Sequence, residues 1–261
     1  MKLEVLLSVL NLNEKKLNKM NITTDCVVIN QCDKKEYKKY KNFKIYSYKE
    51  RGISISRNRA IEKATGDILL LCDDDVIYKS NYEEIILNAF KNNPEADVIF
   101  FNFDTINRIS KTNKKNKRLY IYNSLRYASY NIAFRKESIK KIKFNLLFGS
   151  NENFKGGEDT LFIVDCLKNG LKLYSSTECI GTVNHEKSTW FKGYNERYFF
   201  DKGALFCAIN TPLKDLLCIQ YLLRHRYTYK ELGFLNAYKI MRKGSKSYIM
   251  KKENDKYEIK I

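Results

Sequence analysis

The stretch GDILLLCDDD, residues 66–75, joins an uninterrupted apolar run to three consecutive carboxylates. An apolar run of five residues bounded by acids is typical of a strand that is buried on both faces of a sheet. Three adjacent carboxylates repel one another and reduce stability unless a cation neutralises them. Because ligands of open α/β sheets bind at the carboxyl ends of strands, the acidic triplet predicts a ligand site there.

The segments on either side of this strand alternate between strand-like and helix-like patterns. Strands are expected at 3–10, 25–30, 43–48, 97–103, 119–122, 130–134, 171–174 and 178–183, and helices at 13–20, 34–40, 54–65, 80–92, 135–141 and 157–169. This alternation predicts an α/β fold with a mainly parallel central sheet and helices on both faces. From residue 190 onward the sequence is mostly helical in pattern, basic and aromatic.

Composition narrows the class of protein. Hydrophobic residues make up 44% of the 261 residues and aromatic residues 13%, which excludes a disordered or fibrous chain. No run of about 18 uncharged apolar residues occurs, so we expect no membrane-spanning helix. The seven cysteines include no Cys-x-x-Cys pair, and the first residues lack the pattern of a signal peptide. These features favour a reducing, cytoplasmic location.

The formal charge of +18 is concentrated in two segments. Residues 111–143 hold 11 Lys and Arg against one acid, and residues 186–261 hold 16 against eight. Basic patches of this kind favour phosphates, nucleic acid or an acidic membrane surface as partners. A compositional bias toward Lys and Asn is the alternative explanation.

The acidic triplet has the chemistry of a cation site. Asp73 and Asp75 are expected on the same side of an extended segment, where their oxygens suit Mg²⁺ or Mn²⁺ shared with a diphosphate. A solvated turn with helix-capping aspartates is the alternative interpretation of the triplet alone.

Several motifs in order along residues 3–185 resemble the GT-A glycosyltransferases of family 2. These are GISISRNRA (52–60), ATGDI (64–68), DDD (73–75), FR (134–135), Phe144, Gly149 and GGEDT (156–160). The resemblance implies a GT-A catalytic domain over 1–189, with a nucleotide-sugar-binding half (1–104) and an acceptor half (105–189). Residues 190–261 are then expected to form a basic helical extension. The sequence has no Pro/Gly/Ser-rich linker and no internal repeat, so we expect one α/β domain followed by this extension.

The resemblance also implies roles for the donor side. Asp73 and Asp75 match the Asp-x-Asp that holds the donor ribose and the metal, Mn²⁺ or Mg²⁺, that bridges the diphosphate. Arg57 matches a residue lining the nucleotide pocket, and Asp67 lies where the family carries a donor-side acid. His185 matches a histidine that some members place against the metal or diphosphate, although a lone histidine is also commonly structural.

On the acceptor side, Asp159 matches the usual catalytic base, and Glu158 is its neighbour and potential substitute. A carboxylate is needed to take the proton of the attacking hydroxyl. Acids at the start of a helix are also favoured by the helix dipole, which is the structural alternative for this pair. Trp190, the single tryptophan, is expected to stack on an acceptor sugar or to pack in a core.

The ends of the first two strands depart from the family pattern. LNLN (10–13) replaces a Pro-aromatic-Asn turn, and NQCD (30–33) replaces an acid that contacts the base. Asn11, Asn30, Gln31 and Asp74 complete the expected donor-binding set. The identity of the donor nucleotide therefore stays open.

The resemblance implies an inverting, metal-dependent glycosyltransferase that moves a sugar from a nucleotide-sugar to a saccharide acceptor. A lipid-linked acceptor is expected, as in bacterial surface polysaccharide synthesis. A sugar-phosphate nucleotidyltransferase would need a Gly-rich, Arg-containing loop at 10–17, and a nucleic-acid-binding protein would need a recognisable module; neither is present. Gly-x-Gly-x-x-Gly and Gly-x-x-x-x-Gly-Lys motifs are also absent, which disfavours dehydrogenases and P-loop enzymes.

The C-terminal third has the pattern of a membrane-surface helix between residues 212 and 252. Its expected apolar face consists of Leu213, Leu216, Leu217, Ile219, Leu222 and Leu223. Basic residues and tyrosines surround this face, which predicts peripheral binding to the anionic inner face of the plasma membrane. Packing of the leucines on the catalytic domain is the alternative.

Overall fold

The computed structural model describes residues 1–106, 112–184 and 193–258, with side chains as far as residue 253. The chain forms two compact units. The first comprises Met1–Leu146 and Glu158–Ser188, and the second comprises Leu147–Gly157 and Thr189–Ile261. Residues 147–157 therefore belong with the C-terminal helices, although the sequence places them inside the expected catalytic domain.

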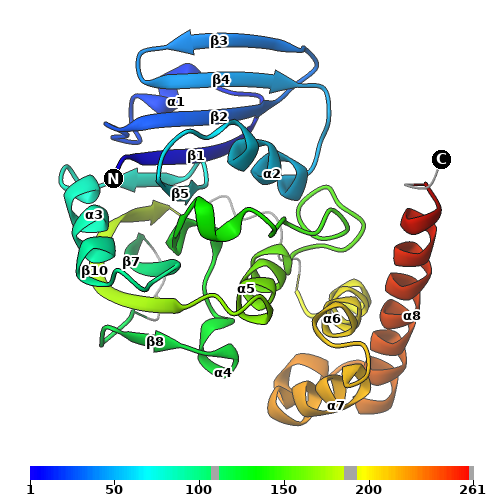
Figure 1. Ribbon diagram of the computed structural model, residues 1–261. Helices are drawn as coiled ribbons and strands as arrows, with labels where there is room; N and C mark the ends of the chain where they lie inside the picture. The colour runs from blue at the N-terminus through cyan, green and yellow to red at the C-terminus, as the bar shows by residue number, and fades with distance from the viewer. Residues whose placement is uncertain (107–111, 185–192, 259–261) are drawn as a thin grey trace. The chain divides into compact units, whose positions relative to one another are not determined.

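The first unit is built on a ten-stranded sheet (Figure 1). Its strands are β1 (Leu3–Leu10), β2 (Asp25–Gln31), β3 (Glu36–Tyr40), β4 (Phe43–Tyr48), β5 (Ile68–Cys72), β6 (Val76–Tyr78), β7 (Val98–Ile106), β8 (Lys117–Leu119), β9 (Ile132–Arg135) and β10 (Leu173–Asn184). The order is β3-β4-β2-β1-β5-β9-β7-β10-β6, with β8 paired to β10. β4, β2, β1 and β5 run parallel to one another, whereas β9 is antiparallel to both β5 and β7.

Apolar residues on both faces explain why these strands form the centre of the sheet. Along β1, Val5 and Leu7 enter one core while Leu6 enters the other. Helix α3 (Tyr82–Asn92) covers the first face, and helices α2 (Ile53–Lys63) and α5 (Glu158–Lys168) cover the second. The shorter α1 (Glu14–Leu17), α4 (Ile121–Ser124), η1 (Ser129–Asn131) and η2 (Glu137–Ile139) complete this unit. The expected α/β fold with a largely parallel sheet is thus confirmed.

Four local expectations were wrong. The strand expected at 119–122 is absent, because the strand there, β8, ends at Leu119 and the short helix α4 begins at Ile121. Residues 34–40 are not a helix, because Glu36–Tyr40 pairs antiparallel with β4 and places Tyr37 opposite Tyr46, with their tilted rings in contact. The two short strands expected at 171–174 and 178–183 are one strand, β10, interrupted by register shifts. The helix expected at 135–141 is only the short 3₁₀ turn η2.

The second unit is helical, as expected. It contains α6 (Glu196–Ile209), α7 (Lys214–Arg224), η4 (Arg226–Tyr229) and α8 (Phe234–Glu258), shown in yellow to red in Figure 1. Its core is formed by Phe199, Cys218, Leu222, Ala237 and Met241. Among the described residues, no helix has the length and apolar character needed to cross a membrane.

Helices α6 and α8 cross in backbone contact. A Cβ atom added to Gly203 would lie 1.9 Å from the carbonyl oxygen of Met241, and one added to Gly244 would lie 1.9 Å from that of Phe200. Each glycine therefore makes room for the backbone of the other helix.

Candidate active site

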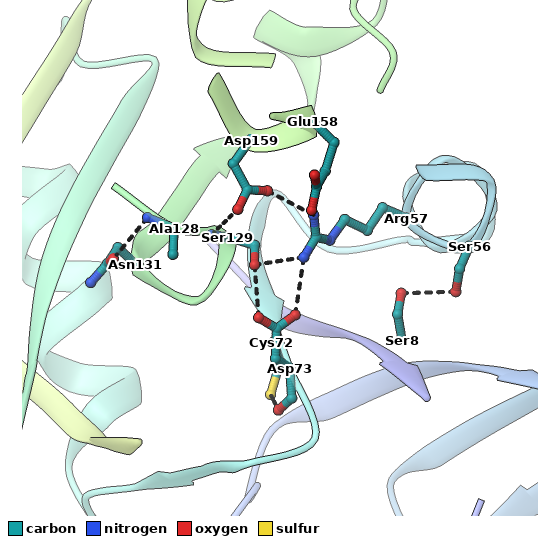
Figure 2. Close-up of polar contacts among 10 residues, drawn as sticks. All are labelled: Ser8, Ser56, Arg57, Cys72, Asp73, Ala128, Ser129, Asn131, Glu158 and Asp159. Atoms are coloured by element: carbon teal, nitrogen blue, oxygen red, sulfur yellow. Dashed lines mark hydrogen bonds and ion pairs between the residues drawn. The ribbon is translucent and has the colours of Figure 1, made fainter. Parts of the chain in front are cut away.

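The sheet topology brings polar residues from four elements to one place. Asp73 directly follows β5, and because β9 is antiparallel to β5, the turn η1 that precedes β9 lies beside the same strand end. Arg57 comes from α2, and Glu158 and Asp159 come from the first turn of α5. Figure 2 shows the side chains of these residues converging.

Arg57 is the centre of the cluster. Its side chain is only 5% exposed, and its Nη1 lies 2.7 Å from Oδ1 of Asp159 and 3.3 Å from Oε1 of Glu158. Its Nη2 lies 3.1 Å from Oδ1 of Asp73. Burial opposes the charged form of Arg57, but the three carboxylates outweigh burial and raise its pKa, so the guanidinium stays positive.

Ser129 in η1 connects the two acidic groups that the sequence assigned to different substrates. Its Oγ accepts a hydrogen bond from Nη2 of Arg57 at 2.6 Å and donates one to Oδ2 of Asp73 at 2.9 Å. Its backbone N–H donates to Oδ2 of Asp159 at 2.9 Å (Figure 2). Sequence reasoning missed Ser129, because it belongs to no motif and its single signal is its place just before an apolar strand.

The carboxyl groups of Glu158 and Asp159 lie next to each other beside Arg57. Burial raises the pKa of Asp159 to about 7, and the neighbouring Glu158 adds to this rise while Arg57 opposes it. A base whose pKa lies near neutrality is matched to accepting a proton at physiological pH. Oε2 of Glu158 is buried and has no hydrogen-bond partner among the described residues.

The carboxyl group of Asp75 is partly buried and lies near two further acids, Asp73 and Asp74. Burial, followed by repulsion from Asp73 and Asp74, raises the pKa of Asp75 to about 6. Its Oδ1 is buried and has no hydrogen-bond partner within the part of the chain that the structure describes. A desolvated carboxylate oxygen next to further acids is the donor chemistry that Mg²⁺ and Mn²⁺ prefer, so these residues fit a divalent cation.

The described residues alone do not assemble a full metal site. They contain no group of three His, Cys, Asp or Glu side chains placed to hold one ion. His185, the third expected ligand, and Trp190, the expected acceptor contact, both lie outside the described residues.

Asn11 and Asp74 come together at the end of β1. They line a small pocket of about 180 Å³, together with Lys16, whose Nζ lies 2.5 Å from Oδ2 of Asp74. Asn11 adopts a left-handed conformation, with φ of 51°, which turns the chain away from the strand end. This pocket lies on the expected donor side.

Asn30 and Gln31 are already engaged within the protein. Oδ1 of Asn30 accepts a hydrogen bond from the N–H of Leu12 at 2.9 Å, and its Nδ2 donates to Oγ of Ser47 at 3.1 Å. Oε1 of the buried Gln31 accepts from the N–H of Gly52 at 2.6 Å. The Asn30 side chain therefore holds Leu12, which lines the pocket, whereas the Gln31 side chain holds Gly52 at the start of α2. Their expected contact with a base stays a prediction.

The profile described as Glycosyl transferase family 2 matches residues 6–156. The chain belongs to this family. The expected family is thereby confirmed, and the matched range includes Arg57, the acidic triplet and Ser129.

Solved structures show the same fold. S. aureus TarS 1–349 in complex with UDP-GlcNAc has a TM-score of 0.62 and 17% identity, covering 88% of this chain and 74% of that one. The mannosyltransferase PcManGT from Pyrobaculum calidifontis, in complex with GDP-Man and Mn²⁺, has a TM-score of 0.52 and 13% identity, covering 93% and 73%.

One curated relative shares a short stretch of sequence. The glucosyl-dolichyl phosphate glucuronosyltransferase of Haloferax volcanii is 39% identical over 46 residues. That stretch is 18% of this chain and 15% of the relative's length.

The Gly-Asp motif of the family does not lie at the cluster. Asp67 precedes β5 and accepts a hydrogen bond from the N–H of Lys2 at 2.7 Å, whereas Asp73 follows the same strand. An extended strand rises about 3.3 Å per residue, so the two acids lie at opposite ends of β5. Gly66 is needed for packing there, since a Cβ would lie 2.8 Å from Cβ of Glu4. The structure therefore places Asp67 at the other end of β5 from the cluster, and its expected donor-binding role stays a prediction.

Proposed function

We propose that this chain is a metal-dependent, inverting glycosyltransferase that moves a sugar from a nucleotide-sugar donor to a hydroxyl of a saccharide acceptor. The observation that carries the proposal is the network of Arg57 and Ser129, which links Asp73 at the end of β5 to Asp159 at the start of α5. A donor-side acid and a base are thus held in one rigid frame. The bound UDP-GlcNAc and GDP-Man of the solved relatives support a nucleotide-sugar donor.

Asp159 acts as the general base. It takes the proton of the acceptor hydroxyl while that oxygen bonds to the anomeric carbon and the bond to the diphosphate oxygen breaks. Arg57 and the N–H of Ser129 hold one oxygen each of the carboxylate, which fixes its direction. A single displacement of this kind inverts the anomeric centre. The like charge of Glu158 raises the pKa of Asp159 and so makes it a stronger base.

Asp73 and Asp75 would hold the cation, Mn²⁺ or Mg²⁺. When bound, the cation neutralises the charge that develops on the departing nucleoside diphosphate. The unpartnered oxygen of Asp75 supports this assignment, as does the Mn²⁺ in the Pyrobaculum structure. His185 is proposed as a further ligand, because the N–H of the preceding Asn184 donates to the carbonyl oxygen of Asp75 at 3.1 Å.

The remaining contacts are proposed from the same arrangement. Asn11 and Asp74 would contact the donor in the pocket at the end of β1, where Asn30 holds the lining residue Leu12. Gln31, which holds Gly52, is proposed as a further donor contact. Trp190 would contact the acceptor. The acceptor is proposed to be a lipid-linked saccharide in surface polysaccharide assembly, with the enzyme cytoplasmic and bound at the inner face of the membrane.

A panel of nucleotide-sugars tests the proposal. UDP-, GDP-, dTDP- and CMP-sugars are added with Mn²⁺, and the thermal shift and the release of nucleotide are measured. The true donor should raise the melting temperature by mass action and should be hydrolysed slowly, and EDTA should suppress the hydrolysis. Nucleic-acid binding with neither stabilisation nor hydrolysis by any donor would refute the proposal.

A further inference from the structure

Helix α7 has two apolar faces, where the sequence predicts one. Cys218 and Leu222 are buried in the core of the second unit. Leu216, Ile219 and Leu223, spaced three and four residues apart, point outward with 61%, 37% and 53% of their surface exposed. Leu213, just before the helix, is 49% exposed. We call Leu213, Leu216, Ile219 and Leu223 the outer stripe.

Leu222 is fully buried within the core of the second unit itself, whereas the outer stripe is exposed. Contiguous apolar side chains exposed on one helical face mark an interaction site rather than ordinary surface.

The charge around the outer stripe is strongly positive. Residues 212–252 hold ten Lys and Arg against two acids, Asp215 and Glu231. Asp215 is already engaged, since its Oδ1 lies 3.5 Å from Nε of Arg242 and accepts a hydrogen bond from Tyr238 at 3.2 Å. The exposed Arg224, Arg226 and Lys230, which follow the stripe, form no salt bridge within the described residues.

We propose that the outer stripe and the cations of Arg224, Arg226 and Lys230 form a docking surface for a bilayer that contains anionic phospholipid. Such a surface buries the leucines among acyl chains while the cations meet lipid phosphates. A second copy of the chain would bring like charges together. A soluble polyanion would neutralise the cations but leave the leucines in water. The purpose of this surface rests on the proposed function: it is the part of the chain that would bring the enzyme to a lipid-linked acceptor.

Vesicle binding by the whole protein tests this surface directly. The chain is centrifuged with vesicles of phosphatidylcholine alone or of phosphatidylcholine mixed with phosphatidylglycerol. We expect binding to the mixed vesicles, weakening as salt is raised, and little binding to the neutral ones. Equal binding to both, or to neither, would overturn the proposal.

Two matched pairs of variants locate the binding. Leu216→Ser/Leu223→Ser should reduce partitioning roughly tenfold, whereas Leu125→Ser/Leu146→Ser, two exposed leucines of the first unit, should not. Arg224→Gln/Arg226→Gln/Lys230→Gln should reduce it roughly 10- to 100-fold, whereas the equal charge change Lys19→Gln/Lys91→Gln/Lys168→Gln should reduce it far less. Equal losses in variant and control would contradict the assigned surface.

Two further measurements separate the possible causes. Light scattering without lipid detects self-association. If the wild type forms a dimer that Leu216→Ser/Leu223→Ser abolishes, and vesicle binding of this variant is unchanged, the partner of the outer stripe is a second copy and the proposal is overturned. Donor hydrolysis without lipid, together with circular dichroism, reports on the fold and the active site. Normal hydrolysis with absent vesicle binding would refute this surface alone, and the reverse would refute the proposed function alone.

Discussion

Nη1 of Arg57 lies 2.7 Å from Oδ1 of Asp159, and this ion pair joins the helix after β4 to the helix that begins at Glu158. The other oxygen of Asp159 receives the N–H of Ser129. Both oxygens of the proposed base are therefore fixed by neighbours that also contact Asp73. The following predictions test what each member of this network does.

Asp159→Asn should suppress sugar transfer by roughly 10²- to 10⁴-fold and leave nucleotide affinity almost unchanged, because a base acts on the acceptor proton. Transfer rates and calorimetric binding of the donor measure the two effects. Glu158→Gln is the control and should cost much less. If Glu158→Gln abolishes transfer while Asp159→Asn does not, the base is Glu158.

Transfer should increase as pH rises through about 7, because Asp159 accepts a proton only when it is ionised and burial raises its pKa to about 7. Glu158→Gln removes a like charge, so the rising limb of the pH–rate profile should move to lower pH. A limb that stays in place, or moves upward, would contradict the assignment of the titrating group.

Asp75→Asn should reduce metal-dependent turnover by on the order of 10²-fold or more, because a ligand charge is lost. It should also stabilise the metal-free protein. The pKa of Asp75 is raised to about 6 from an unfolded value of 3.8, so its ionisation costs stability as pH rises through this range and costs nothing below it. Melting temperatures of both proteins at pH 4 and pH 8 without metal measure this. A gain at pH 8 but not at pH 4 is expected; the opposite pattern would refute the argument.

Ser129→Ala removes the hydroxyl that bridges Arg57 and Asp73 but keeps the N–H that holds Asp159. We expect weaker donor and metal binding, by roughly tenfold, with an unchanged pH–rate limb. Ser129→Thr keeps the hydroxyl and should restore most of the affinity. A shifted limb with normal donor affinity would mean that the hydroxyl serves the base instead.

Asp67→Asn should leave donor affinity and turnover within about twofold of the wild type, because Asp67 lies at the other end of β5 from the cluster and its contact is the N–H of Lys2. Gly66→Ala should destabilise the protein by about 1–3 kcal/mol, since its Cβ would collide with Glu4. Urea titrations and donor binding measure both. A large loss of donor affinity in a stable Asp67→Asn protein would instead support the donor-binding role of this residue.

Local patterns were sufficient for the centre of the fold. The run Ile68–Cys72 is apolar on both faces, and the acids after it mark the strand end where the cluster forms. The segment Glu36–Tyr40 was mispredicted because its structure depends on pairing with β4, which its own sequence does not reveal. Asp67 lies away from Asp73 for a related reason, since residues close in sequence can flank a strand at opposite ends.

The connections within the site depend on contacts between distant residues. Ser129 is 56 residues from Asp73 and 30 from Asp159, so the folded chain alone brings the three together. Likewise, helical periodicity grouped Leu222 with Leu223, but Leu222 is buried in the core that includes Met241, whereas Leu223 is exposed.

The glycine crossing of α6 and α8 determines which changes in chain length the helical unit can tolerate. One residue inserted between Phe234 and Gly244 would turn the helix by about 100° and present a side chain where the backbone of α6 leaves no room. Met241, which packs against α7, would turn with it and lose its partners. Related sequences should therefore vary freely in side chains on the outer surface of α8 before Gly244, yet show no single-residue insertions or deletions there.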